Sequence, residues 1–187
     1  MRELLEDPFY EKIGAYKNCI IDYCLIADDK PYQGKPSHKN AILFAMLKVI
    51  ERDIDEDLFP WSLDIGKAQA HEIDATALFH VPEILRTNRV GQRSYDCSLP
   101  DPLKGEQIPY WYAFWETPHP SGYGPDDFRE VNSVLFPEGT DQLEIYEWTT
   151  DWSNYFDDGC EWWGTACWSI YDKRLNRYIV IMASTTD

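Results

Sequence analysis

The sequence lacks the cysteine spacings and long apolar runs that mark disulfide-rich or membrane-spanning proteins. Its five cysteines are an odd number and include no CxxC pair, so we expect reduced thiols and no cysteine-based zinc site. The longest apolar run, residues 41–50, is ten residues long and contains Lys48, which is too short to cross a bilayer. The N-terminus has no apolar stretch typical of a signal peptide. These absences favour a cytoplasmic protein.

Familiar catalytic motifs are also missing. The chain contains no GxSxG, GxGxxG or SxxK motif and no P-loop lysine, which favours a non-enzymatic role. His71 and Glu72 could open an HExxH zinc motif, but Ala75 stands where the second histidine is needed. The sequence therefore predicts neither a metal site nor a cofactor.

Basic residues are scarce. The 187 residues include 17 Lys and Arg against 33 Asp and Glu, a formal net charge of −16. A surface this negative repels phosphate, so nucleic acid and anionic membranes are excluded as expected partners. Aromatic residues make up 15% of the chain, which is typical of a folded protein and not of a disordered acidic one.

The charge imbalance is concentrated in residues 130–172. This stretch contains ten acidic residues, ten aromatic residues and no Lys or Arg. A solvated acidic tail would not be aromatic, so we expect the stretch to fold and its carboxylates to line a surface or cleft.

The first half of the chain has a helical pattern. Apolar residues recur at helical spacing between Phe9 and Ala27 and again after Ser37, which we expect to cap the second helix. The expected helices are 9–27, a helix starting after Ser37, 64–79 and a short one at 81–89. Residues 91–108 contain Pro100 and Pro102 without periodicity, which predicts a linker.

The second half changes character. The run Tyr110–Trp115 is rich in β-prone aromatic residues and apolar on both faces, which predicts a central strand. A helix is expected from Pro125 to Leu135, followed by strands at 143–149, 165–171 and 177–183. The prediction is one α+β domain over residues 1–187, in which a helical part at 1–90 packs on a mostly antiparallel sheet of about four strands within a β-rich part at 109–187.

The run from Glu147 to Gly164, with the two strands that end at Asp187, resembles the C-terminal part of an uncharacterised group of small acidic bacterial cytoplasmic proteins. In size, charge and tryptophan content the chain is also similar in kind to immunity proteins that neutralise bacterial toxins. The second resemblance implies a basic protein partner and assigns no residue a role.

Tryptophans beside carboxylates suggest a binding surface. Trp152, Trp162 and Trp163 lie in a segment without bases, and Trp is enriched at interface hot spots. They could instead cover the sheet. The predicted charged rim consists of Asp151, Asp157, Asp158 and Glu161, and Glu144 is a further expected binding residue.

An alternative is a small hydrolase or carbohydrate-binding protein. His119 follows the expected central strand, where it could act as a general base oriented by Glu116, with Glu147 as a further carboxylate. The preferred hypothesis is a non-enzymatic, acidic module that binds a basic protein, as an immunity protein would bind a toxin. The pattern does not fix an oligomeric state.

Overall fold

The protein is built on one antiparallel sheet that joins both halves of the chain. The computed structural model describes residues 1–52, 61–81, 107–117, 121–162 and 164–184, with the backbone alone for 160–162. The strands are β1 (Arg2–Glu3), β2 (Ile21–Ala27), β3 (Ala70–Ile73), β4 (Leu143–Trp148), β5 (Ala166–Asp172) and β6 (Arg177–Ala183). Their order is β1-β2-β6-β5-β4-β3, and every neighbouring pair is antiparallel.

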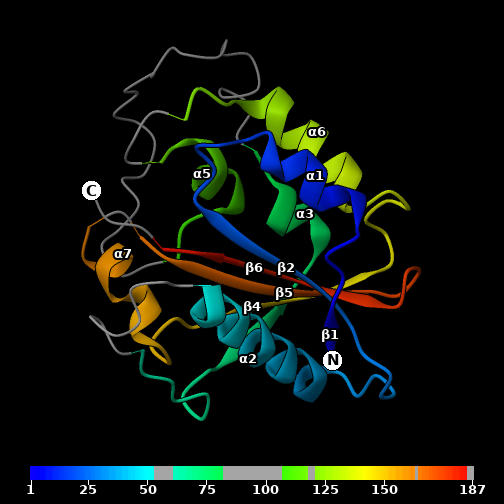
Figure 1. The fold of residues 1–187 in the computed structure, drawn as a ribbon, viewed down its shortest axis with the longest axis vertical. Helices are drawn as coiled ribbons and strands as arrows, with labels where there is room; N and C mark the ends of the chain where they lie inside the picture. Colours follow the sequence, from blue (N-terminus) through cyan, green and yellow to red (C-terminus); the bar gives the residue numbers. More distant parts are fainter. Residues whose placement is uncertain (53–60, 82–106, 118–120, 163, 185–187) are drawn as a thin grey trace.

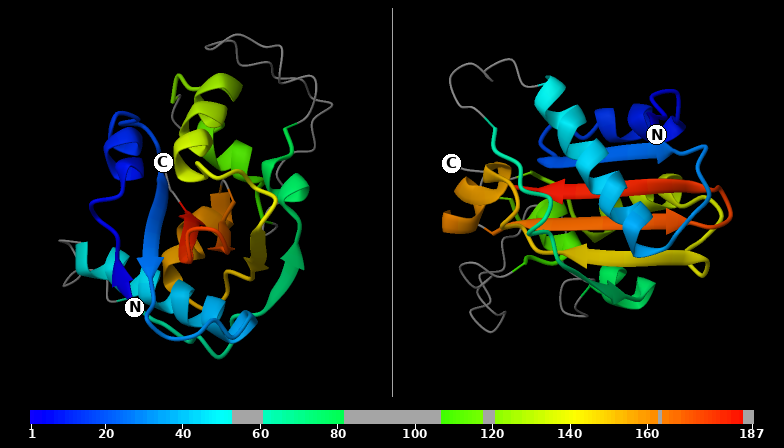
Figure 2. Two further views of the ribbon diagram at one scale, coloured as in Figure 1. Left: turned by 90° about the vertical axis from the view of Figure 1, so that its right-hand side faces the viewer. Right: turned by 90° about the horizontal axis from the view of Figure 1, so that it is seen from below.

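Helices cover both faces of the sheet (Figures 1 and 2). They are α1 (Pro8–Gly14), α2 (Lys35–Arg52), α3 (Ala75–Phe79), α5 (Tyr110–Trp115), α6 (Pro125–Leu135), the short 3-10 helix η1 (Asn154–Phe156) and α7 (Asp157–Trp162). Helix α2 lies on one face, and α1, α3, α5 and α6 lie on the other (Figure 1). Two apolar clusters result, one on each face, and the central strands β5 and β6 are buried along their whole length. The predicted α+β class is therefore confirmed, with six strands in place of about four.

The expected helix at 9–27 is wrong beyond its first turns. Helix α1 ends at Gly14, and residues Ile21–Ala27 form β2, which pairs with β6 from Ile21 to Ile26. The unbroken apolar run at the end of this segment suits a strand that is buried on both faces, which periodicity alone does not distinguish from a buried helix. Residues 1–90 are consequently not a purely helical part, because they supply three of the six strands.

The run Tyr110–Trp115 is a helix, not the central strand predicted from its aromatic residues. All of its side chains except Tyr112 are buried, so α5 is apolar on nearly every side and sits inside the core between the sheet and α6. A short helix that is buried all round has no polar face and gives no helical period. Tyr110 also anchors it, since its hydroxyl contacts Tyr23 on β2 at 2.9 Å and Asn132 on α6 at 3.0 Å.

The expected helix at 64–79 is also wrong over most of its length. Residues Ala70–Ile73 form the edge strand β3, paired with β4, and only Ala75–Phe79 are helical. Asp74 caps this short helix by accepting a hydrogen bond from the Ala77 N–H at 2.7 Å. Ser37 is not an N-cap, because α2 already begins at Lys35. Residues 82–106 lie outside the described part of the chain. They include the expected helix at 81–89 after its first residue and the expected linker at 91–108 except its last two residues.

The C-terminal elements follow the predictions closely. Helix α6 and strands β4, β5 and β6 lie where expected, to within a residue or two. The turn between β5 and β6 is fixed by Asp172, whose Oδ1 accepts from the Arg174 and Leu175 amides at 2.9 and 3.1 Å. Asn176 takes the positive φ of 49° that this hairpin requires, a conformation that asparagine tolerates well.

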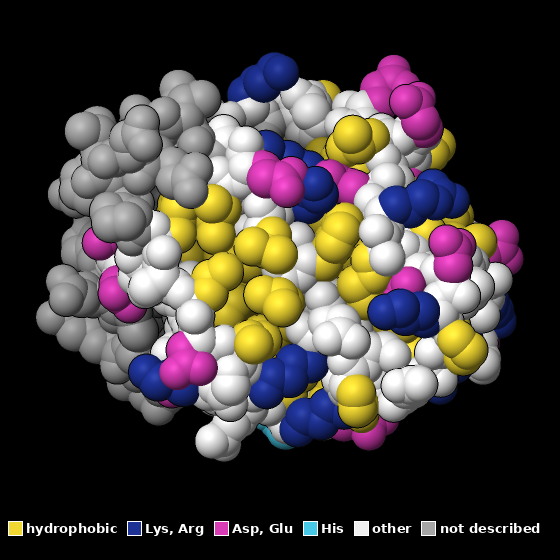
Figure 3. Space-filling view, turned by 60° about the horizontal axis from the view of Figure 1, so that its bottom comes forward, with side chains coloured by type: hydrophobic (Ala, Val, Ile, Leu, Met, Phe, Trp, Pro, Cys, Tyr) yellow, Lys and Arg dark blue, Asp and Glu magenta, His cyan; other side chains and the backbone are white. Residues whose placement is uncertain are grey.

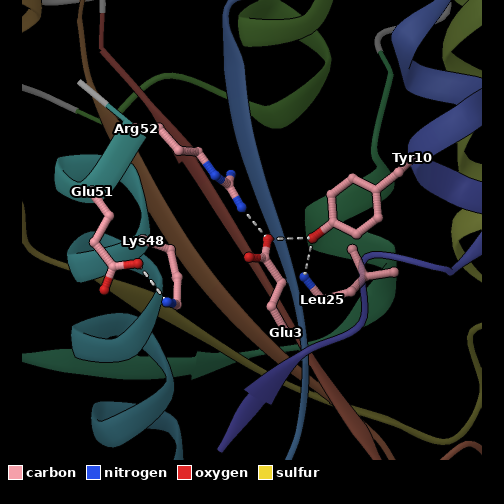
Figure 4. Close-up of polar contacts among 6 residues, drawn as sticks. All are labelled: Glu3, Tyr10, Leu25, Lys48, Glu51 and Arg52. Atoms are coloured by element: carbon pink, nitrogen blue, oxygen red, sulfur yellow. Dashed lines mark hydrogen bonds and ion pairs between the residues drawn. The ribbon is translucent and has the colours of Figure 1, made fainter. Parts of the chain in front are cut away.

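A polar network ties the N-terminal strand to both helical layers (Figure 4). The Leu25 amide donates to the Tyr10 hydroxyl at 3.0 Å, and that hydroxyl donates to Glu3 at 2.9 Å. Arg52, the last residue of α2, pairs with the same Glu3 carboxylate, which is only 7% exposed. The network therefore joins β1, α1, β2 and the end of α2. Lys48 and Glu51 form a separate ion pair within α2.

Candidate functional site

Strand β4 presents its two glutamates, Glu144 and Glu147, to opposite faces of the sheet. Glu144 lies on the α2 face, where it accepts a hydrogen bond from Tyr32 and pairs with Lys173 at 3.2 Å. Glu147 lies on the other face. There it accepts from the Trp168 indole at 3.1 Å and pairs with His71 at 3.0 Å. Both carboxylates are engaged with neighbouring side chains of the sheet.

The indole of Trp152 lies in the core and is not an exposed anchor. The residue is 1% exposed and packs among Trp148, Phe156 and the α2 residues of the same apolar cluster. Its backbone carbonyl accepts from the Asp64 amide at 2.8 Å. The prediction that Trp152 offers its ring to a partner is therefore wrong at this position. The side chains of Glu161 and Trp162, and all of Trp163, lie outside the described residues.

A polar pocket forms where the segment after β4 meets the loop that precedes β3. The two segments are joined by the bridge between Leu63 and Ser153 and by the Ser62 amide, which donates to the Asn154 side chain at 2.8 Å. The pocket has a volume of about 370 Å³. Its lining residues are Ser62, Leu63, Asp64, Lys67, Asp151, Trp152, Ser153, Asn154 and Asp157.

The charges of this pocket are unbalanced. Three carboxylates, from Asp64, Asp151 and Asp157, line it together with one base, Lys67. Asp64 uses one oxygen to accept from the Gly66 amide at 3.2 Å. Asp151 and Asp157 are exposed, and among the described residues neither carboxylate makes a hydrogen bond or an ion pair. Asp158 follows the lining residue Asp157 in the chain and is exposed, but it does not line the pocket. The sequence thus predicted two of the three carboxylates and missed Asp64, which tertiary contact alone brings in.

The alternative catalytic set is not seen assembled. His119 lies outside the described residues. Glu116 is the half-buried C-cap of α5, and Glu147 is committed to Trp168 and His71. Across the described ranges, no group of three or more His, Cys, Asp or Glu side chains is placed to hold a metal ion.

The structure also contains a buried chain of hydrogen-bonded side chains that the sequence analysis did not predict. His38, on the inner side of α2, contacts the Ser169 hydroxyl through Nδ1 at 2.8 Å and the Tyr32 hydroxyl through Nε2 at 2.9 Å. The Trp148 indole donates to the same serine oxygen at 2.7 Å. Tyr32 in turn donates to Glu144. His38 and Ser169 are both fully buried.

The hydrogen bonds in this chain all run in one direction. Because Tyr32 donates to Glu144, its oxygen accepts from His38, which assigns the proton to Nε2. Nδ1 then accepts from the Ser169 hydroxyl, whose oxygen receives the Trp148 N–H. Burial lowers the pKa of His38 to about 4, despite the attraction of nearby Glu144. A neutral, enclosed histidine and a serine without solvent access fasten α2 to the sheet and offer no nucleophile to a substrate.

Three further findings concern the thiols, membrane-spanning helices and similarity to known proteins. Cys19, Cys24 and Cys167 are free thiols, as predicted; Cys97 and Cys160 lie outside the described side chains. None of the described helices is both long and apolar enough to pass through a bilayer. Comparison with protein-family models, with curated proteins and with solved structures finds no match for this chain.

Proposed function

We propose that the protein is a non-enzymatic binding module whose acidic pocket receives a basic side chain of a protein partner. The observation that carries this proposal is the pair of exposed carboxylates of Asp151 and Asp157, which have no ion-pair partner among the described residues and line a pocket whose described lining holds one base, Lys67. Three carboxylates beside one base leave an excess of negative charge in the free protein, and a cation relieves this repulsion. A volume of about 370 Å³ suffices for one arginine or lysine side chain.

The net charge of the whole chain supports a basic partner. A formal charge of −16, with ten acids and no bases over residues 130–172, produces a negative field around the pocket. Such a field accelerates the encounter with a positive protein, while contacts inside the pocket control dissociation. An arginine would gain more than a lysine, because its planar guanidinium can bind two carboxylate oxygens at once.

An apolar surface lies on the α2 face of the molecule (Figure 3). Leu47 is 44% exposed, and Leu43 and Ile50 on the same helix are half-buried. Leu63 and Ile65 pack against the apolar cluster on the α2 face of the sheet and are also half-buried. Leu63 lines the acidic pocket as well. Apolar contact area next to a charged pocket is the usual composition of a protein interface.

The charges on α2 indicate which part of this surface would receive a basic partner. The helix carries Lys35, Lys39, Lys48 and Arg52 against the single acid Glu51. The basic part of the partner would therefore dock at the pocket and not over α2. A toxin-neutralising immunity protein in the cytoplasm, bound to a basic toxin, is the specific form of this proposal, supported by the resemblance in size, charge and tryptophan content.

The test uses a fluorescein-labelled nona-arginine peptide as a defined basic probe, measured by fluorescence anisotropy. Asp151→Asn with Asp157→Asn should weaken binding by roughly tenfold, since two charge-assisted contacts are lost. Glu6→Gln with Asp29→Asn makes the same change in net charge at two exposed acids away from the pocket and should reduce affinity far less. Equal losses in the two double variants would show that only overall charge matters and would refute the pocket.

Salt dependence separates this function from carbohydrate binding, which the polar lining of Ser62, Ser153 and Asn154 would also suit. Binding to a basic protein should weaken steeply between 50 and 300 mM salt, roughly over the range in which the Debye length falls below 10 Å. A neutral oligosaccharide would bind with little response to salt. Salt-insensitive binding of a sugar at this pocket, without binding of the arginine peptide, would replace the proposal with the alternative.

A further inference from the structure

A second pocket, separate from the acidic one, lies on the opposite face of the sheet between α3 and α6. Its volume is about 680 Å³, within the range of small-molecule sites. The lining residues are Ala75, Thr76, Phe79, His80, Val81, Pro125, Phe128, Arg129, Asn132, Ser133, Phe136 and Thr140. Both helices lie on the same side of the sheet (Figures 1 and 2).

Aromatic side chains form the walls of this pocket and are held by the core behind them. The rings of Phe79 and Phe136 meet edge to face with centroids 5.3 Å apart. Phe128 packs on Tyr110 at 4.8 Å in the same manner. Phe128 and Phe136 are 2% and 4% exposed, so the walls cannot rearrange without disturbing the core. A preformed apolar wall lowers the entropy cost of binding a flat, apolar group.

The polar lining favours a negative group on the ligand. The amide of Asn132 is already used, since its nitrogen donates to the Phe128 carbonyl at 2.8 Å and its oxygen accepts from Tyr110 at 3.0 Å. Among the described lining residues, Arg129 and His80 are the charged or titratable ones, and none is a carboxylate. In a chain with 33 acids and 17 bases, a described lining that holds a cation and no acid is unusual.

Arg129 can turn toward a ligand at little cost. Its present partner is Asp126 on the same helix, and the two side chains are 70% and 85% exposed, so their ion pair is weak. The His80 imidazole is exposed and, within the described part of the chain, has no hydrogen-bond or ion-pair partner. Both groups can donate a hydrogen bond to a carboxylate placed at the mouth of the pocket.

We infer that the pocket between α3 and α6 binds a small aromatic carboxylate, with its ring against Phe79, Phe128 and Phe136 and its carboxylate toward Arg129 and His80. This site is independent of the proposed basic-partner function, because it shares no lining residue with the acidic pocket and takes a ligand of opposite charge. The two sites can therefore be tested separately in the same protein.

The experiment compares two probes of nearly equal shape, 3-phenylpropionate and 3-phenylpropylammonium, by saturation-transfer NMR and calorimetric titration. The anion should bind and the cation should not, although the net charge of −16 favours the cation over the protein as a whole. Thr76→Trp, at an exposed lining position, should fill the pocket and abolish binding. A thermal melt of this variant verifies that it folds.

Arg129→Gln tests the charge with little risk to folding, because the side chain is exposed. It should weaken 3-phenylpropionate roughly tenfold. Arg174→Gln is the matched control, since Arg174 is also an exposed arginine paired with an aspartate, Asp141, but does not line the pocket. Equal binding of both probes, or equal effects of the two arginine variants, would overturn the inference. The double variant at Asp151 and Asp157 should leave this binding unchanged.

Discussion

The Nδ1 atom of His38 lies 2.8 Å from the Ser169 hydroxyl, across the buried interface between helix α2 and the middle of the sheet. The two residues are 131 positions apart in the chain. Their contact, with Tyr32 and Glu144 on one side and Trp148 on the other, satisfies polar groups that would otherwise be costly to bury. The interface therefore depends on a neutral histidine.

Acid should weaken the protein through His38. Its pKa is about 4 in the folded protein and near 6.5 in the unfolded chain, so the unfolded chain binds the extra proton between these values. The free energy of unfolding should fall as the pH drops from about 6.5 to 4, by about 3 kcal/mol from this group. Urea unfolding of the wild type and His38→Gln over this range measures the effect. The variant should be less stable at neutral pH and lose this part of the pH dependence; parallel curves would contradict the assignment.

Trp152 should matter for stability and not as an exposed contact. With 1% exposure in the cluster behind α2, Trp152→Ala should lower the free energy of unfolding by about 3–5 kcal/mol. Leu47→Ala, at a residue 44% exposed, should change it by less than about 1 kcal/mol. Chemical denaturation of both variants compares them. A Trp152→Ala protein as stable as the wild type would mean that the indole is not part of the core.

The two ion pairs in Figure 4 should differ in their contribution to stability. Arg52→Met leaves the Glu3 carboxylate, only 7% exposed, without this cation while its contact with Tyr10 stays, and should cost about 1–3 kcal/mol. Lys48→Met removes a partner from Glu51, which is 62% exposed, and should cost about 0–0.5 kcal/mol. Thermal melts at low and high salt provide the comparison. Equal costs for the two variants would argue against a structural role for the Glu3 network.

The described thiols should resist alkylation while the protein is folded. Burial raises the pKa of Cys19 to about 11 and of Cys24 to about 12, and it raises the pKa of Cys167 further. Little thiolate is thus present at pH 8. In a protein with Cys97→Ser and Cys160→Ser, iodoacetamide should add to these three thiols only after denaturant is added. Rapid labelling under native conditions, detected by mass spectrometry, would show that one of them is open to solvent.

Local pattern was a good guide for helix α6, which has one polar and one apolar side. Helix α6 begins with Pro125 and two aspartates and buries Phe128, Val131 and Leu135 at helical spacing, so propensity and burial agree. It failed for Tyr110–Trp115 and Ile21–Ala27, where burial on all sides removes the period that separates helix from strand. The prediction that Trp152 is part of an exposed binding surface was wrong for a related reason, since composition does not say which of several tryptophans enters the core.

The sequence alone determined the charge of the protein, the acidic aromatic character of residues 130–172, and the C-terminal strands with the helix before them, because these depend on composition and neighbouring residues. Tertiary structure decided the rest. The acidic pocket needs Asp64 from the loop before β3 beside Asp151 and Asp157, and the core network needs His38 opposite Ser169. Strand pairing and helix packing bring together residues more than eighty positions apart in the chain. A pattern of neighbouring residues does not predict which of these distant residues will be in contact.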